Sequence, residues 1–333
     1  MNKKNIVLFL PDLLRGYQEG AFPALNRILS RASCIKNAPR SLENGVKSFF
    51  QGLGIEEIPS GALGALNEGI IDRHNNHVWC QVAPIECTVD HQAAYINGNA
   101  QLNLTPAEMQ ILTQLISPLF EQAGMKLILS SSQTWFCELQ SNAQVVMNDL
   151  LESLGKNMGF LLPSGPDAMF WHRLMTECQM VLTQSSVNES RQKHHLPLIS
   201  SLWFWGLGAL PSNISTSFSQ VITNNATMGG LAKLSGTALT SLPDKFDKSV
   251  FSSSSLIFDD KFSILFKHKM QEAYTKQLIY YENHWFAPLL DGLEKGDIRQ
   301  LSIMSGDGRE FRITPWQLKY FWKRIKPMEA FYV

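Results

Sequence analysis

Three histidines and two cysteines between positions 74 and 91 are of the residue types that bind zinc. They follow one another as His74-x2-His77-x2-Cys80-x6-Cys87-x3-His91. Imidazole nitrogens and thiolates are common zinc ligands, but this spacing matches no standard zinc site. Cys80 and Cys87 also fall on predicted strands, where a free cysteine packs as a small apolar side chain. We therefore favour core cysteines over a metal centre.

Basic and aromatic residues alternate near the C-terminal end, from Trp316 to Lys326. Such a segment suits RNA, a membrane surface or a protein partner. An amphipathic segment packed on the body of the protein explains the same pattern, and we favour it. It buries Leu318, Phe321, Trp322 and Ile325 and leaves Lys319, Lys323, Arg324 and Lys326 in water.

A weaker signal is Gly229-Gly230, which opens a predicted short helix. Backbone N–H groups at a helix N-terminus bind phosphate, but a pair of glycines without further motif is more often a turn. We favour the turn.

Alternating strands and helices must position these residues. A buried strand at Ile6–Leu10 precedes one helix that opens at Pro23 and another that runs from Ser41 to Gly54. This alternation is typical of an α/β fold. Later predicted helices are Pro166–Leu182, Val187–His194, Thr227–Leu234 and Gln271–Leu293, and later strands are Ser201–Trp205, Ser217–Ile222, Phe262–Phe266 and Leu301–Met304.

Residues 76–140 have a different pattern of short strands around one helix. That helix opens with Thr105-Pro106-Ala107-Glu108, a capping box with proline at the first helical position. The stretch Gly61–Gly69 is predicted to be a loop at the boundary. We therefore predict a core α/β domain formed by residues 1–75 and 141–333, with a small α+β domain inserted at 76–140.

The composition excludes several classes of protein. A chain of 333 residues with 44% hydrophobic residues can bury a large core, and its 29 basic and 29 acidic residues cancel. The chain therefore lacks the positive net charge that would favour binding to nucleic acid or to an anionic membrane. No apolar stretch reaches the roughly 18 residues of a membrane span. Five scattered cysteines without a CxxC pair, and no signal peptide, favour a cytoplasmic protein.

Residues 187–208 carry a family resemblance. Asn188, Arg191, Gly206 and Gly208 match a motif of archaeal-type cofactor-independent phosphoglycerate mutases, whereas Trp205 replaces the arginine of that motif. Weaker similarity extends over most of the chain. The whole pattern is closer still to the bacterial RpfE-type regulatory proteins, a phosphoglycerate mutase-like branch.

The resemblance implies an alkaline-phosphatase-like fold, with a central sheet and flanking helices. Enzymes of that fold transfer a phosphoryl group through a Ser or Thr nucleophile and two divalent metals. Asp12 and Asp307 stand at positions of metal ligands, although both also suit simple turns. Other ligand positions carry Gln271 and Thr275, and the histidine expected after Asp307 is Gly308.

The nucleophile segment of the family is also altered. It reads Leu42-Glu43-Asn44-Gly45-Val46-Lys47-Ser48, without a Ser-Asp or Ser-His pairing, and Ser48 is displaced from the expected position. Asn188 and Arg191 share a helix face that the resemblance places beside the active cleft, as an anion site. A surface Arg191 paired with Glu189 explains the same residues.

The resemblance and the replaced residues together predict a catalytically inactive phosphoglycerate mutase-like protein with a regulatory or scaffolding role. We expect no cofactor and no nucleic acid, and a protein partner that the sequence does not name. The alternative is a divergent phosphomutase or phosphatase with two divalent metals such as Mn or Mg. It would use Asp12, Asp307 and one of Glu43, Asp259 or Asp260. A minor third hypothesis is binding of nucleic acid or a partner by the C-terminal segment.

Overall fold

Two separate sheets organise the chain. The computed structural model describes residues 4–15, 20–54, 57–90, 93–140, 143–320 and 322–332. The chain divides into two compact units, one formed by Met1–Ile55 with Asn213–Val333 and the other by Glu56–Ser212. Each unit has its own hydrophobic core.

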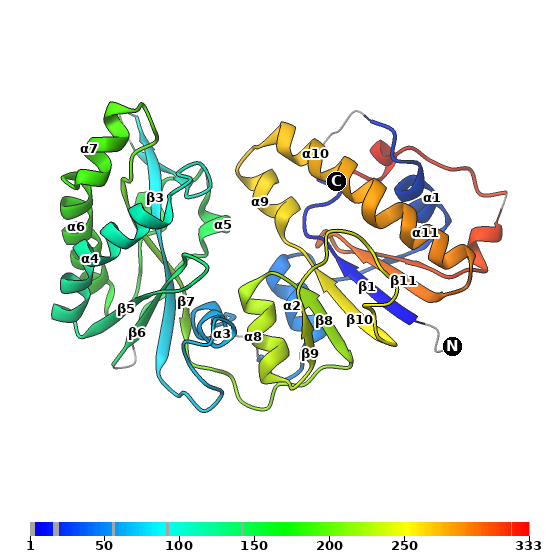
Figure 1. Cartoon of the computed structure of the whole chain (residues 1–333), viewed down its shortest axis with the longest axis horizontal. Coiled ribbons are helices and arrows are strands. Elements are labelled where there is room, and N and C mark those ends of the chain that lie inside the picture. The colour runs from blue at the N-terminus through cyan, green and yellow to red at the C-terminus, as the bar shows by residue number, and fades with distance from the viewer. Residues whose placement is uncertain are drawn as a thin grey trace. The chain divides into compact units, whose positions relative to one another are not determined.

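A seven-stranded sheet forms the centre of the first unit (Figure 1). Its order is β2-β12-β11-β1-β10-β8-β9. At one edge, β12 pairs antiparallel with both β11 and β2, and the other pairs of this sheet are parallel. The adjacent central strands β1 and β10 end in continuous apolar runs, Ile6–Phe9 and Leu256–Phe258, as expected for buried parallel strands. The strands are β1 Lys4–Phe9, β2 Ser33–Lys36, β8 Gln220–Thr223, β9 Ala238–Thr240, β10 Ser254–Phe258, β11 Ile298–Met304 and β12 Arg309–Ile313.

Helices with locally encoded starts flank this sheet. Ser41 caps α2 by accepting from the Asn44 N–H at 3.1 Å, and Asn225 caps α8. The helices are α1 Pro23–Arg31, α2 Leu42–Phe49, α8 Ala226–Leu234, α9 Lys261–Lys267, α10 Gln271–Tyr281 and α11 Ala287–Glu294. A π turn, η2 Glu282–Phe286, joins α10 to α11, and 3₁₀ turns form η3 Gln317–Lys319 and η4 Met328–Phe331.

The second unit is built on an antiparallel sheet of order β4-β3-β6-β5, with β7 paired to β3. In Figure 1, α4, α6 and α7 lie on one side of this sheet. Trp79 and Phe136 instead pack with Ala62 and Ala65 of α3. The elements are α3 Ser60–Asn67, β3 Val78–Val89, β4 Ala94–Gly98, α4 Pro106–Gln122, β5 Met125–Leu129, β6 Trp135–Leu139, α5 Leu150–Ser153, η1 Met158–Phe160, α6 Ala168–Thr183, α7 Ser186–Lys193 and β7 Ser201–Gly208.

The predicted α/β class, with a central sheet, flanking helices and an inserted α+β unit, is confirmed. The observed insertion is wider than the predicted 76–140, because β7 completes its sheet: Phe204 lies opposite Val82 of β3. None of the described helices is long and apolar enough to cross a membrane.

Two predicted elements are wrong. The Gly61–Gly69 loop is mostly helix α3, whose glycines allow close packing: a Cβ on Gly61 would lie 2.5 Å from the Cα of Cys80. The predicted strand Phe262–Phe266 is helix α9. A short apolar run does not distinguish a strand from a buried helix by its periodicity.

Candidate functional site

Four aspartates follow neighbouring strands at one edge of the seven-stranded sheet. Asp12 follows β1, Asp259 and Asp260 follow β10, and Asp307 follows β11. Because β1 pairs in parallel with both β10 and β11, the carboxyl ends of the three strands meet at this edge. Open α/β sheets bind their ligands at such an edge. The structure therefore brings Asp12 and Asp307, the predicted metal ligands, to the same edge.

Asp12 lies in a tight turn with a left-handed backbone, φ 63°. Its Oδ2 accepts a hydrogen bond from Ser263 Oγ at 2.7 Å, and its Oδ1 lies 3.5 Å from Nε of Arg15. The hydroxyl of Tyr274 donates to the main-chain carbonyl of Asp12 at 2.9 Å and holds the turn. Both carboxylate oxygens of Asp12 therefore have protein partners. Sequence reasoning missed Ser263, because it placed this residue on a strand.

Asp307 is bound by Arg309, two residues further along the chain. Oδ1 accepts from the Arg309 backbone N–H at 2.9 Å, and Oδ2 accepts from the Nε of the same residue at 2.9 Å. Only 1% of the Asp307 side chain is exposed. A buried carboxylate neutralised by a guanidinium in this way is an internal ion pair, so a metal would have to displace Arg309 to bind it.

Asp259 and Asp260 also have protein donors. Tyr281 donates its hydroxyl to Asp259 Oδ2, and the Lys261 backbone N–H donates to Oδ1 at 3.0 Å. Burial, together with the nearby Asp259 carboxylate, raises the pKa of Tyr281, so its hydroxyl stays protonated and donates. The side-chain amide of Asn225 donates to Asp260 Oδ2 at 2.8 Å.

The displaced nucleophile candidate, Ser48, lies inside helix α2. Its hydroxyl donates to the carbonyl of Gly45 at 2.6 Å, a bond that helical serines commonly make. Glu43, on the same helix, forms an ion pair with Lys47 at 2.7 Å. Neither contact is that of a general base with a nucleophile.

These contacts test whether the edge fits two divalent metals. Catalytic metal pairs need several carboxylates and imidazoles converging on one point. Within the described ranges, no three His, Cys, Asp or Glu side chains are grouped so that they could hold a metal ion. Each edge aspartate already accepts hydrogen bonds from protein groups. The residues at this edge therefore do not fit a two-metal centre.

Asn188, a predicted substrate-binding residue, is 4% exposed and serves the interior of the second unit. Its side-chain amide donates to the carbonyls of Leu182 and Ile199, at 3.0 and 2.9 Å, and its Oδ1 accepts from the Ile199 N–H at 2.9 Å. This pattern joins the end of α6 to the segment that leads into β7. Both the nitrogen and the oxygen of the side-chain amide are therefore hydrogen-bonded within the protein.

Arg191, the second predicted substrate-binding residue, is 2% exposed. Nε donates to the carbonyl of Pro197 at 2.7 Å, Nη1 to Glu108 Oε1 at 2.8 Å, and Nη2 to the carbonyl of Leu102. The alternative of a surface arginine paired with Glu189 is wrong, because Arg191 is buried and its partner is Glu108, the partly exposed capping-box residue of α4. All three guanidinium nitrogens contact the protein, so we infer that Arg191 and Asn188 are structural.

Among the described residues, the zinc-like side chains do not come together as a metal site. Cys80 is buried and lies opposite Cys137 across β3 and β6. Burial raises the pKa of Cys87 to about 11, which disfavours the thiolate that zinc needs. The His77 ring pairs with Glu138 at the surface, and His91 lies outside the described residues.

The Gly229-Gly230 pair lies within helix α8. Gly229 donates its N–H to the Asn225 carbonyl at 2.9 Å, so the group is part of the helix and not available to a phosphate. The interpretation of this pair as a turn is wrong for the same reason.

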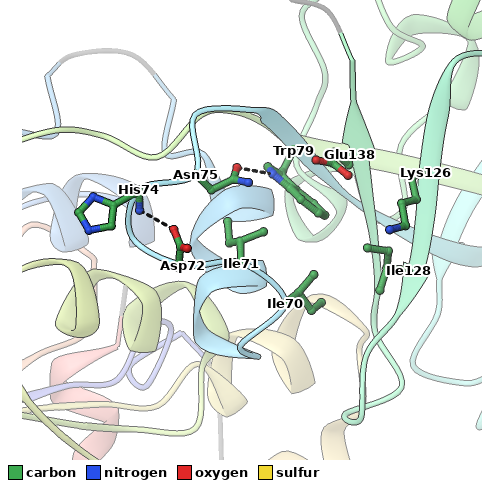
Figure 2. A pocket seen from close by; sticks show the side chains of 9 residues that line it. All are labelled: Ile70, Ile71, Asp72, His74, Asn75, Trp79, Lys126, Ile128 and Glu138. Atoms are coloured by element: carbon green, nitrogen blue, oxygen red, sulfur yellow. Dashed lines mark hydrogen bonds between the residues drawn. The ribbon is translucent and has the colours of Figure 1, made fainter.

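A pocket of about 420 Å³ lies in the second unit, between the loop after α3 and strands β5 and β6 (Figure 2). Its polar side chains include Lys126 and Glu138, which are cross-strand neighbours. The Trp79 indole donates to Asn75 Oδ1 at 3.0 Å beside the pocket. The pocket combines an apolar wall with charges of both signs. Its apolar lining is Ile70, Ile71, Trp79 and Ile128.

Sequence reasoning missed this pocket, because its residues come from three separate segments. The one signal available was the charged pair Lys126 and Glu138 on neighbouring predicted strands.

Comparisons with known proteins show a low similarity to two solved structures. No protein-family model matches the chain, and no curated protein matches it. A cofactor-independent phosphoglycerate mutase from Thermoplasma acidophilum is 15% identical, over 98% of this chain and 94% of that one, with a TM-score of 0.43. The PH0037 protein from Pyrococcus horikoshii is 14% identical, over 94% and 88% of the two chains, with a TM-score of 0.45.

Proposed function

We propose that this chain is a non-catalytic, phosphoglycerate mutase-like α/β protein with a regulatory or scaffolding role in the cytoplasm. The observation that supports this proposal most is the state of the sheet edge. Asp307 is bound by Arg309, Asp12 by Ser263 and Arg15, and the aspartates after β10 by Tyr281 and Asn225.

The reason lies in the chemistry of phosphoryl transfer. Two metals activate a hydroxyl and offset the charge of the phosphate, and the protein must leave carboxylates open to hold them. Here the carboxylates make hydrogen bonds that stabilise the fold instead. The Ser48 hydroxyl donates to the Gly45 carbonyl of its own helix. The fold then serves as a platform for a ligand or a partner, and the pocket beside Trp79 and Lys126 is a place for a small amphipathic ligand.

Hydrolysis of nitrophenyl phosphate tests the proposal. Purified protein is assayed with Mn²⁺ or Mg²⁺. The Asp12→Asn variant shows whether any hydrolysis depends on the aspartates at the sheet edge. We expect the same rate with wild type, variant and buffer containing metal alone. Metal-dependent hydrolysis that disappears in Asp12→Asn would overturn the proposal.

A divergent metal-dependent phosphomutase or phosphatase is the second candidate. One observation favours it: Asp12 and Asp259 follow adjacent parallel strands, the arrangement in which α/β enzymes place such ligands. In this case Tyr281 would have to release Asp259. The Tyr281→Phe variant removes that donor, so this candidate predicts a higher Mn²⁺ affinity for the variant, whereas the first proposal predicts no binding in either form.

A further inference from the structure

The C-terminal segment 316–326 exposes Trp322 and Ile325, which the sequence pattern placed inside, and it also exposes Trp316. Trp316 is 66% exposed, Trp322 65% and Ile325 47%. Only Leu318, at 8%, is buried as expected, and Phe321 lies outside the described residues. Large apolar side chains grouped at a surface mark an interaction site. We call residues 316, 319, 320 and 322–326 the basic aromatic surface.

The rings of this surface form one continuous group. Trp316 and Tyr320 meet edge to face with centroids 4.7 Å apart, and Tyr320 and Trp322 stack at 4.8 Å. The Lys323 ammonium lies 5.4 Å from the centre of the Tyr320 ring. The segment thus presents indoles and an aliphatic side chain beside cations.

Hydrogen bonds anchor the segment to α1 and β2. The Lys326 backbone N–H donates to Ser30 Oγ at 2.8 Å, Gln317 donates to Ser33 Oγ at 2.7 Å, and Lys323 reaches the carbonyl of Arg31 at 3.4 Å. An anchored segment loses less conformational entropy when it binds a partner than a free tail does.

The charge of the segment has one sign. Residues 316–326 contain four bases and no Asp or Glu. The chain as a whole carries 29 bases and 29 acids, so this is a positively charged segment in a chain with no formal net charge. The four bases are Lys319, Lys323, Arg324 and Lys326.

We propose that the basic aromatic surface binds the protein peripherally to anionic lipid membranes. Indoles and aliphatic side chains enter the boundary between headgroups and acyl chains, and bases next to them meet anionic headgroups. No described helix can cross a membrane, so the contact is with one leaflet. This proposal does not depend on the proposed function.

Two observations favour lipid over single-stranded nucleic acid. Tyr320 and Trp322 already stack on each other at 4.8 Å and leave no space for a base between them. Ile325 is exposed, and an aliphatic side chain gives a base no stacking platform but suits acyl chains.

Co-sedimentation with vesicles tests the proposal on the full chain. One set of vesicles is pure phosphatidylcholine and the other also contains about one-third phosphatidylserine. We expect binding to the anionic vesicles that falls with salt, and at least about tenfold weaker binding to the neutral ones.

Three variants locate the contact. Trp316→Ala/Trp322→Ala is expected to weaken binding about tenfold or more, and Lys319→Gln/Arg324→Gln/Lys326→Gln to remove the preference for anionic vesicles. The matched control is Phe160→Ala/Met169→Ala, which removes two side chains 87% and 76% exposed in the second unit, and it should bind like wild type.

Several results would overturn the proposal. One is no sedimentation with anionic vesicles. A second is equal vesicle binding by the wild type and the folded tryptophan and glutamine variants. A third is a control variant that binds as weakly as the tryptophan variant. Binding to poly-uridine that requires the two tryptophans, without vesicle binding, would assign the surface to RNA. Circular dichroism checks that each variant is folded, and the triple glutamine variant tests the surface even where the tryptophan variant unfolds.

Discussion

Arg309 holds the buried carboxylate of Asp307 through both its backbone N–H and its guanidinium, and the same guanidinium donates to the carbonyl of Phe331 at 2.6 Å. The position that the family resemblance assigns to a metal ligand therefore joins β12 to the chain end.

The first prediction follows from this ion pair. Arg309→Met leaves a carboxylate that is 1% exposed without its cation, and should lower the free energy of unfolding by about 3 kcal/mol. Urea unfolding followed by fluorescence measures this loss. If Asp307 instead repels its neighbours and awaits a metal, Asp307→Asn will raise stability in metal-free buffer.

The second prediction concerns Arg191. Arg191→Met removes three buried donors and the partner of Glu108, and should cost about 3 kcal/mol in the free energy of unfolding. Arg191→Lys should recover little of this loss, because one ammonium cannot reach three separate acceptors.

Arg173 provides the matched control for Arg191. It pairs with Glu177 on α6 at 2.8 Å, but its side chain is 81% exposed. Arg173→Met should therefore leave the free energy of unfolding almost unchanged. An Arg191→Met variant as stable as the wild type would contradict the structural role of Arg191 and support ligand binding instead.

The third prediction is a pH dependence. Burial opposes the ionisation of Glu108, but the Thr105 N–H and the Arg191 guanidinium outweigh it and lower the pKa of Glu108 below 4.5. Because the folded pKa is depressed, ionised Glu108 stabilises the fold above its unfolded pKa, and this contribution is lost as the pH falls through the folded pKa.

Thermal unfolding of Glu108→Gln measures this effect. The wild type should exceed the variant in Tm near neutral pH, and the difference should shrink below about pH 4. Glu121→Gln, an exposed residue on the same helix, should show no such change. A difference in Tm that is constant over this range contradicts the prediction.

The fourth prediction concerns Glu282 in the π turn. The residue is 6% exposed, and its carboxylate accepts from the N–H groups of Ala24 and Leu25, at 2.6 and 3.1 Å, so it caps α1 from another element. Glu282→Ala should cost about 2 kcal/mol, whereas Glu272→Ala, at an exposed position of α10, should cost little. Urea unfolding of both variants checks this, and equal losses would show that the cap is unimportant.

Local signals in the sequence predicted much of the fold. The capping box at Thr105 and Glu108 and the proline that opens α1 act within one helical turn, so the sequence alone reveals them. Helix α3 was missed because its glycines were taken as loop formers. Gly64 instead allows Phe136 to approach, a contact that depends on a distant strand.

The site was predictable only in part. The places of Asp12 and Asp307 after parallel strands follow from the local pattern and are observed. The donors that bind them, Ser263 and Arg309, were not identified, because such pairing depends on tertiary packing or on a side-chain rotamer. The burial of Arg191 was missed for the same reason: its partner Glu108 is 83 residues away.

Titration of Mn²⁺ into metal-free protein, with free Mn²⁺ read by electron paramagnetic resonance, tests the central claim most directly. The account predicts that the free Mn²⁺ signal rises as in buffer, because Asp12, Asp259 and Asp307 are engaged with protein donors. Saturable uptake of two Mn²⁺ per chain with micromolar affinity, abolished by Asp12→Asn, would contradict it.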